Sequence, residues 1–397
     1  MNFRIKKITS TDLISLVILI SCINITFLNS IFSGMTQILF WVRIIAILGL
    51  VIRNLFIRHK YTTTFKWLSV FILFSLLCTQ FGYGNVGYAL RLLSIPFLIS
   101  LCIDSYQKSI IPILRIWKNT LWIIVIADAL SMILYPSGLY TDDLYSENWF
   151  LGYKTARLVY SLPLCIITAY LSEMKNKKIN MESYLAIIIS AICLYHSKST
   201  AANVGILLIG VFFIFFNFSK IIKGSEKIIY KILNYKVFIP LYGLLVTFTI
   251  LIDRSPIMQY FVVNILGKSP TLTTRTFIWE SCLNLIASSP IYGVGYLYAE
   301  KYVEITGNVF ATSAHNMVLS ILVSTGVVGL LLYVVLIISA TKRRNATYHR
   351  HEAVLIAGII AMLIVGITSS TLVFSAFGFA FYILLGIPLK KNCNGGL

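Results

Sequence analysis

Long apolar segments alternate with short polar ones along almost the whole chain. A helix needs about 20 apolar residues to cross a bilayer core of about 30 Å, and windows of that kind recur twelve times. The predicted spans cover residues 12–30, 36–57, 67–81, 86–104, 119–136, 155–172, 183–197, 201–219, 237–252, 313–340, 352–369 and 371–388. The pattern predicts an all-α, polytopic integral membrane protein with about 12 transmembrane helices.

Residues 253–312 form the only large predicted segment outside the membrane. Loops longer than about 12–15 residues usually carry function. The chain is therefore expected to divide into nine spans over 1–252, an outer loop with short amphipathic helices over 253–312, and three spans with a short tail over 313–397. The first span lacks a small-residue cleavage site and another span follows at once, so we do not expect a cleavable signal peptide.

The composition agrees with a membrane location. Hydrophobic residues make up 58% of the chain and charged residues 12%, whereas a soluble domain has about 25% charged residues. Disorder and a collagen-like fibre are excluded, and so is a secreted disulfide scaffold. Six of the seven cysteines lie in or beside apolar runs and none forms a CxxC pair. They are expected to be packing residues, with neither a disulfide framework nor a zinc site.

The net charge of +19 has two readings, nucleic-acid binding or membrane topology. With the N-terminus placed in the cytoplasm, 24 of the 33 basic residues fall in cytoplasmic segments. This distribution obeys the positive-inside rule in every loop. The sequence therefore predicts two cytoplasmic termini and no nucleic-acid partner.

Nine basic residues do not fit the cytoplasmic loops. They are Arg43, Arg91, Lys154, Arg157, Lys198, Arg254, Lys268, Arg275 and Lys301. Arg43 lies within the second span and the others lie at or beyond the outer face. Charges in or near the bilayer are kept where they pair or bind something. Arg157, Lys198 and Arg275 come from separate segments that face one compartment, which favours a cationic site for an anionic ligand such as phosphate.

Other readings stay open for the remaining charges. Lys154, Lys268 and Lys301 are expected to be solvated loop charges. Arg43 and Arg91 each have a second reading, which is pairing with an acid such as Asp128 in the fifth span. No metal site is expected, because Asp142, Asp143 and Glu147 have no histidine or carboxylate partner at a convincing spacing.

The outer loop has internal order. Apolar residues at helical spacing predict a short amphipathic helix over 257–265, after Pro256. A second helix is predicted to start at Thr273 and Thr274 and to stop before Ser288. Arg275 would lie in the first turn of that helix, where free backbone N–H groups also attract anions. Glu280, one turn later, would orient Arg275 or stabilise the helix.

Two further features lie toward the end of the outer loop. The run from Pro290 to Tyr296 holds two glycines and two tyrosines, which suit either an approach to a sugar or an ordinary turn. The loop ends at His315 and Asn316, directly before the tenth span. A histidine at the membrane mouth is able to act as a general base near neutral pH.

The order of these motifs resembles the O-antigen polymerase and O-antigen ligase superfamily, which includes capsule polymerases of the Wzy type. The motifs are Arg275-Thr276-Phe277-Ile278-Trp279, Ser289-Pro290-Ile291-Tyr292-Gly293-Val294-Gly295, His315-Asn316 and Ser324-Thr325-Gly326-Val327-Val328-Gly329. The turn Ser197-Lys198-Ser199-Thr200 is similar to that family's Ser-Arg-Ser/Thr turn, with lysine where arginine is commoner. This block covers about a sixth of the chain, and the span pattern extends the likeness.

The resemblance implies a metal-independent, inverting glycosyltransferase without a cofactor. Its donor would be a glycan on undecaprenyl diphosphate and its acceptor a sugar hydroxyl. The reaction would take place at the outer face of the bacterial cytoplasmic (inner) membrane, so that repeat units of O-antigen or capsule are polymerised. His315 would be the base and Arg275 would neutralise the leaving diphosphate. The residues expected to bind diphosphate or glycan are Arg157, Lys198, Arg91, Arg254, Asn316 and Tyr292.

The resemblance also implies membrane lipid contact and partners such as a chain-length regulator and a flippase. Two other functions remain open from the sequence. One is a ligase that moves finished glycan to lipid A core or protein. The other is a lipid-linked oligosaccharide flippase, although a flippase does not need a large ordered outer loop.

Overall fold

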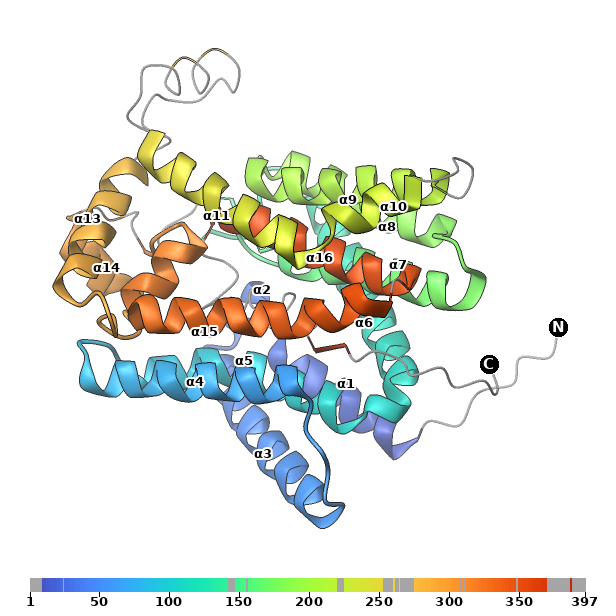
Figure 1. Cartoon of the computed structure of the whole chain (residues 1–397), viewed down its shortest axis with the longest axis horizontal. Coiled ribbons are helices and arrows are strands. Elements are labelled where there is room, and N and C mark those ends of the chain that lie inside the picture. The colour runs from blue at the N-terminus through green and yellow to red at the C-terminus, as the bar shows by residue number, and fades with distance from the viewer. Residues whose placement is uncertain are drawn as a thin grey trace.

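The computed structural model describes residues 9–23, 25–141, 147–154, 156–219, 225–252, 260, 264, 275–307, 309, 312–347, 349–369 and 386–387. Throughout these residues the regular elements are helices (Figure 1), and the only bridges of strand type are two isolated ones. The helices are α1 (Ser10–Cys22), α2 (Thr26–Ile31), α3 (Met35–Phe56), α4 (Thr63–Phe81), α5 (Val86–Ser105), η1 (Gln107–Ser109), α6 (Ile110–Leu134), α7 (Leu158–Asn176), α8 (Met181–His196), α9 (Thr200–Phe218), α10 (Ser225–Ile232), α11 (Tyr235–Ile252), α13 (Arg275–Ser288), α14 (Ala299–Thr306), α15 (Met317–Thr347) and α16 (Arg350–Gly366). The predicted all-α fold is confirmed.

The helices follow the predicted spans. Each of the first eleven spans contains a described helix, whereas the twelfth, 371–388, lies outside the described residues apart from 386–387. Within the described part, six helices are long and apolar enough to cross a membrane, and a seventh is added if α10 and α11, bent by 52°, count as one span. The multi-pass membrane fold is confirmed, and the total of twelve spans stays a prediction.

Two predicted spans are broken. The first, 12–30, is divided into α1 and α2 by extended backbone at Ile23 and Ile25. The tenth, 313–340, forms α15 but is interrupted at Gly326, whose φ of 62° and ψ of −164° are not helical. Hydrophobic windows report only length and composition, so neither break was visible in the sequence.

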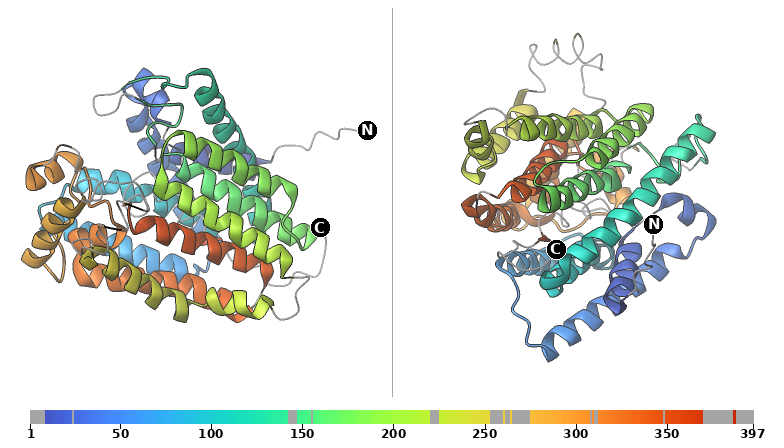
Figure 2. Two further views of the ribbon diagram at one scale, coloured as in Figure 1. Left: turned by 90° about the horizontal axis from the view of Figure 1, so that it is seen from above. Right: turned by 90° about the vertical axis from the view of Figure 1, so that its right-hand side faces the viewer.

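Two groups of packed helices position the site. In Figure 1, α4 and α15 lie side by side, with α13 and α14 at one end of the pair. In Figure 2, α16 runs among the green helices and packs against α7 and α9. A third group joins α1, α3 and α5. The outer-loop helices therefore rest on the end of the α4–α15 pair.

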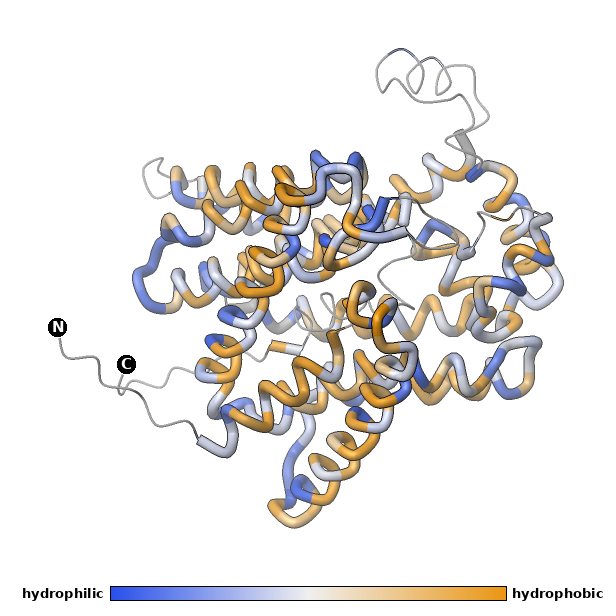
Figure 3. Tube along the Cα trace, turned by 180° about the vertical axis from the view of Figure 1, so that it is seen from behind, coloured by the Kyte–Doolittle hydropathy of each residue, from blue (hydrophilic) through white to orange (hydrophobic). Residues whose placement is uncertain are grey.

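The surface is that of a membrane protein. Figure 3 shows hydrophobic residues along the helices, with hydrophilic ones gathered near turns and ends. Large apolar side chains such as Ile45, Ile133 and Leu244 are exposed on helix surfaces. A soluble monomer rarely exposes contiguous apolar surface on this scale. The six cysteines from Cys22 to Cys282 are buried and free, so the predicted packing role is confirmed for them.

One of the two helices predicted in the outer loop lies within the described residues and is confirmed. The second predicted helix is α13, which begins at Arg275 and ends at Ser288. The first, 257–265, lies outside the described residues except at 260 and 264. Three short helices were not predicted: η1 between the fourth and fifth spans, α10 in the loop before α11, and α14 in the outer loop.

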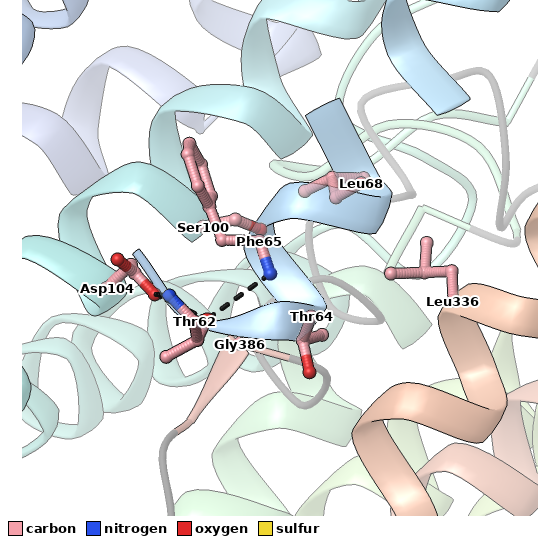
Figure 4. A pocket seen from close by; sticks show the side chains of 8 residues that line it. All are labelled: Thr62, Thr64, Phe65, Leu68, Ser100, Asp104, Leu336 and Gly386. Carbon is pink, nitrogen blue, oxygen red and sulfur yellow. Dashed lines mark hydrogen bonds between the residues drawn. The ribbon is translucent and has the colours of Figure 1, made fainter. Parts of the chain in front are cut away.

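A small pocket lies where α4 begins and α5 ends (Figure 4). Asp104 is buried there and accepts hydrogen bonds from the backbone N–H of Thr62 at 3.0 Å and from the hydroxyl of Thr62 at 2.5 Å. The Nε2 atom of His59 lies 2.8 Å from the other carboxylate oxygen of Asp104. These contacts satisfy the first turn of α4, and we read the cluster as structural.

Candidate functional site

The helix that carries Arg275 is fixed against the segment that carries His315. Trp279 lies one turn after Arg275 in α13, and its indole Nε1 donates a hydrogen bond to the main-chain oxygen of Ala314 at 3.0 Å. Trp279 and Ala314 are both buried in one apolar cluster that joins α13 to α15. Because His315 follows Ala314 directly, the structure brings the two predicted catalytic residues onto contacting segments.

Arg275 is the first residue of α13 and its side chain is partly buried. Burial lowers the pKa of its guanidinium, because desolvation disfavours the charged form. The ordinary pKa of arginine is above about 12, so the side chain stays a cation at neutral pH. Arg275 also lies in the first turn of α13, and the backbone N–H groups of a helix's first turn favour an anion.

The backbone of His315 is strained. Its φ is +48°, in the left-handed region that non-glycine residues rarely adopt. Lys198, another predicted site residue, has a φ of +56°. The other non-glycine residues with positive φ in the described part of the chain are Arg58 and Lys177. Such strain persists only where surrounding contacts enforce it, and it often marks functional sites.

Asn316 supplies contacts that hold His315 in place. The side-chain oxygen of Asn316 accepts a hydrogen bond from the backbone N–H of Leu319 at 3.0 Å, which caps the start of α15. Its side-chain nitrogen donates to the main-chain oxygen of Ile367, just after α16, at 2.8 Å. Asn316 is fully buried. It was predicted to bind substrate, and its observed contacts are those of a residue that positions its neighbour.

Arg157 lies in the protein interior. Its side chain is 1% exposed, its Nε lies 2.9 Å from an oxygen of Asp128, and its guanidinium lies 4.8 Å from the ring of Trp149. The other oxygen of Asp128 accepts the backbone N–H of Leu151 at 2.9 Å. The pair therefore ties α6 to the outer segment before α7. Arg157 reaches the predicted region, but with its charge compensated by a carboxylate.

This pairing corrects one reading of the sequence. Asp128 was considered as a partner for Arg43 or Arg91, and its partner is Arg157. Arg43 donates hydrogen bonds to the main-chain oxygen of Ser21 at 2.8 Å and to the hydroxyl of Ser94 at 3.0 Å. The Ser21 oxygen belongs to the last turn of α1, so the Arg43 cation satisfies the end of the broken first span.

Arg91 and Lys198 are exposed. Within the described residues neither takes part in a salt bridge. Lys198 lies in the turn between α8 and α9, and Arg91 lies in the second turn of α5. Arg254 lies outside the described residues, so its predicted role stays a prediction.

The ends of three helices meet near the site. A Cβ added to Gly205 in α9 would lie 2.6 Å from the side chain of Val365 in α16 and 4.0 Å from that of Leu158 in α7. Asn316 bonds to Ile367, two residues after Val365. Arg157 precedes Leu158, so the end of α7 is linked through α16 to the segment of His315. The structure thus connects the elements that carry Arg157, Lys198 and His315.

The run from Pro290 to Tyr296 is held by protein on both sides. The backbone N–H groups of Val294 and Gly295 donate to main-chain oxygens of Val323 and Ser324 at 2.7 and 3.1 Å. On the other side the N–H groups of Tyr83 and Asn85 donate to main-chain oxygens of the run. The glycines are therefore used for close backbone packing at the α15 break, rather than for approach to a sugar.

Tyr292, which was predicted to bind glycan, is 59% exposed. Its ring centroid lies 6.5 Å from that of Phe74 in α4. Tyrosine at such a place suits either a bilayer interface or a stacked sugar, so its binding role stays a prediction.

Sequence reasoning did not assign a role to Trp279 or Ile367, and it gave Asp128 the wrong partners. Trp279 was part of the quoted motif, and its spacing of four from Arg275 was the available signal. Asp128 is an isolated acid inside an apolar span, which is itself a signal of pairing. Ile367 contributes only a main-chain oxygen, for which no sequence signal exists.

Known proteins are similar to part of this chain. Residues 185–334 match the family model described as O-antigen ligase. A stretch of 121 residues is 28% identical to the exopolysaccharide production protein ExoQ of Rhizobium meliloti (strain 1021), and it covers 26% of this chain and 27% of that protein. The matched family region includes Lys198, Arg275 and His315. These matches confirm the resemblance to the O-antigen ligase and polymerase superfamily and support a membrane function related to polysaccharide.

Proposed function

We propose that this protein polymerises surface polysaccharide, either O-antigen or capsule, at the outer face of the bacterial cytoplasmic membrane. It transfers a glycan from undecaprenyl diphosphate to a sugar hydroxyl of an acceptor chain. The observation that carries the proposal is the Trp279–Ala314 hydrogen bond, which joins the helix of Arg275 to the segment of His315. An arginine and a histidine so joined are the cation and the base that such a transfer needs.

The proposed reaction is a single displacement. His315 accepts the proton of the acceptor hydroxyl while that oxygen attacks C1 of the donor sugar. The bond from C1 to the diphosphate oxygen breaks, and the diphosphate leaves with the electron pair. Arg275 neutralises the charge that develops on it, with Lys198 assisting. Attack from the face opposite the leaving group inverts the anomeric centre, and no metal or cofactor takes part.

The remaining predicted residues act around this centre. Arg157, compensated by Asp128, fixes the outer end of α7. Asn316 holds the backbone of His315. Arg91, Arg254 and Tyr292 bind the donor or the growing glycan. A flippase delivers the donor, and a chain-length regulator acts on the product.

A ligase is the second candidate, because the matched family model is described as O-antigen ligase. The same displacement serves both functions. The two differ in the acceptor, which is a repeat unit for a polymerase and a lipid A core or protein for a ligase.

The test is glycan analysis of a deletion strain complemented with wild type or with His315 variants. His315→Asn is the sharpest variant, because asparagine tolerates a positive φ but is no base at neutral pH. His315→Gly, which adopts positive φ freely, is the second. Insertion in the membrane is verified for each by blotting. Single repeat units on the acceptor in the deletion and in both variants, with ladders restored by wild type, are the expected result.

Other outcomes would overturn the proposal. Full-length polymer left on its lipid carrier, with none on the acceptor, would identify a ligase. Repeat units held on the inner leaflet would identify a flippase. Wild-type ladders from His315→Asn would remove His315 from the mechanism.

A further inference from the structure

Helix α10 has three separate edges. On a helical wheel, Glu226, Ile229, Tyr230 and Leu233, which directly follows α10, share one side, and these residues are partly or fully buried. Lys227 and Lys231 lie together on a second edge and are exposed. Ile228 and Ile232 form an adjoining edge and are also exposed, at 62% and 58%. Each exposed pair is spaced by four residues, so each forms a continuous edge.

The buried side attaches α10 to the protein. Glu226 forms an ion pair with Arg350 at the start of α16, and Arg350 also contacts Glu173 of α7 at 3.4 Å. Arg350 further donates to the main-chain oxygen of Phe216 near the end of α9, at 2.7 Å. Arg350 therefore links α10 to α16 and, through its own contacts, to α7 and α9, and this link holds the orientation of α10. Its exposed edges point away from the protein for a structural reason.

The isoleucine edge continues an exposed apolar surface. Helix α10 is bent by 52° from α11, which is apolar enough to form a span with it. Leu241 and Leu244 of α11 are exposed, as is Phe218 at the end of α9. Ile228 and Ile232 thus lie where two helices with exposed apolar surfaces end, and the positive-inside rule predicts the cytoplasmic side for this loop.

We propose that α10 is a membrane-surface helix that binds the anionic headgroups of the inner leaflet. Ile228 and Ile232 enter the boundary between headgroups and acyl chains, and Lys227 and Lys231 contact lipid phosphates. A bent helix with adjoining apolar and basic edges has the form of an interfacial helix. Lysine side chains reach the headgroups with their charged ends while their stems stay at the apolar boundary.

The charge pattern favours a lipid surface over a peptide or protein partner. Lys227, Lys231 and the nearby exposed Lys236 are all basic, and the acid of α10, Glu226, is held by Arg350. A negative surface is therefore the complementary one, and the inner leaflet presents such a surface next to the end of α11. This inference does not depend on the glycan-transfer reaction.

The first experiment measures the depth of the isoleucine edge. A cysteine is placed by Ile228→Cys or, as the matched control, by Lys227→Cys, in a Cys393→Ser background; the six described native cysteines are buried. Each variant carries a fluorescent probe in nanodiscs that contain phosphatidylglycerol. We expect the probe at 228 to be quenched by spin-labelled lipid and the probe at 227 by aqueous iodide. Equal quenching of both by iodide would overturn the proposal and indicate a solvent or protein-facing surface.

The second experiment measures the charge preference. Native mass spectrometry compares retention of phosphatidylglycerol with that of phosphatidylcholine by wild type, by Lys227→Gln with Lys231→Gln, and by Lys175→Gln with Lys178→Gln. The control pair is exposed, belongs to a loop predicted to lie on the same side of the membrane, and removes equal charge. We expect the α10 pair to lower the preference for the anionic lipid about tenfold and the control to leave it nearly unchanged. Equal effects would mean that only total charge matters, and the site would be rejected.

Discussion

The indole Nε1 of Trp279 donates a hydrogen bond to the main-chain oxygen of Ala314 at 3.0 Å. Trp279 lies in α13 and Ala314 in the non-helical segment before α15, and the bond is buried. Arg275 lies four residues before Trp279 in the same helix, and His315 directly follows Ala314. Trp279 is therefore expected to set the spacing of the two groups proposed to act on the glycan donor.

Trp279→Phe removes the donor and keeps most of the apolar volume. The buried Ala314 oxygen loses a partner, at a cost of about 1–3 kcal/mol, and we expect glycan transfer to fall about tenfold or more because His315 is displaced. Polymer yield at equal protein level is the measurement. Trp122→Phe is the control, since Trp122 also donates its indole N–H, to Glu182 at 3.1 Å. Equal losses from both variants would argue against a positioning role.

Arg275→Lys tests whether the site needs a guanidinium fork. The charge is kept, but two parallel hydrogen bonds to a diphosphate are lost, so transfer is expected to fall about a hundredfold. Lys301→Gln is the control, because Lys301 belongs to an exposed pair with Glu304 in α14. The measurement compares the initial rates of wild type, Arg275→Lys and Lys301→Gln with a lipid-linked donor. Full activity of Arg275→Lys would show that a point charge suffices.

Gly326→Ala tests the break in α15. A Cβ there would lie 2.3 Å from the main chain of Ile291, and the residue would keep a φ of +62°. The strained φ and the forced shift of the neighbouring segment are expected to lower the free energy of unfolding by about 3 kcal/mol. Gly49→Ala in α3 is the matched control, because nothing lies within 4 Å of an added Cβ. Thermal unfolding in detergent compares them, and equal melting temperatures would contradict the tight junction.

Asp128→Asn tests the buried ion pair. Arg157 would stay buried with its charge uncompensated, which costs about 3–5 kcal/mol. The double variant Asp128→Leu with Arg157→Met removes both charges and should recover much of that loss. Chemical or thermal unfolding monitored by tryptophan fluorescence provides the measurement. A double variant less stable than Asp128→Asn would mean that the pair contributes more than mutual compensation.

Cys282 should be inert toward thiol reagents. Burial in α13 raises the pKa of its thiol to about 12, because desolvation disfavours the thiolate. A raised pKa keeps the group in its neutral form across about pH 7 to 9, and the thiolate is the reactive form. Mass spectrometry after maleimide treatment should find Cys282 unmodified in the folded protein and modified after denaturation. Rapid labelling of the native protein at pH 8 would show that the α13 cluster opens.

Much of the fold follows from local sequence patterns. Apolar runs such as 36–57 and 201–219 predict α3 and α9 to within a few residues. The hydroxyl residues before Arg275 predict the start of α13. A helix start or a membrane span depends on neighbouring residues and on the bilayer, so it is visible in one stretch of chain.

The partners of polar groups depend on how the helices pack rather than on the local sequence. Asp128 pairs with Arg157 rather than with Arg43 or Arg91 because the packing of α6 against the start of α7 brings only that arginine within reach. The glycine run after Pro290 packs against the break at Gly326 instead of a sugar, since those backbones meet only after the helices assemble.

The sequence by itself determined that this protein is a helical membrane protein, where most of its helices lie, and which residues carry unusual charge. The tertiary structure decided which of those charges are compensated, that the first predicted span is divided into α1 and α2, that α15 is interrupted at Gly326, and that Trp279 joins the segments of Arg275 and His315. The physical reason is the separation along the sequence between the residues that interact. Hydrophobic periodicity is a property of adjacent residues, whereas a hydrogen bond or ion pair between distant residues exists only where helix packing brings two atoms to about 3 Å.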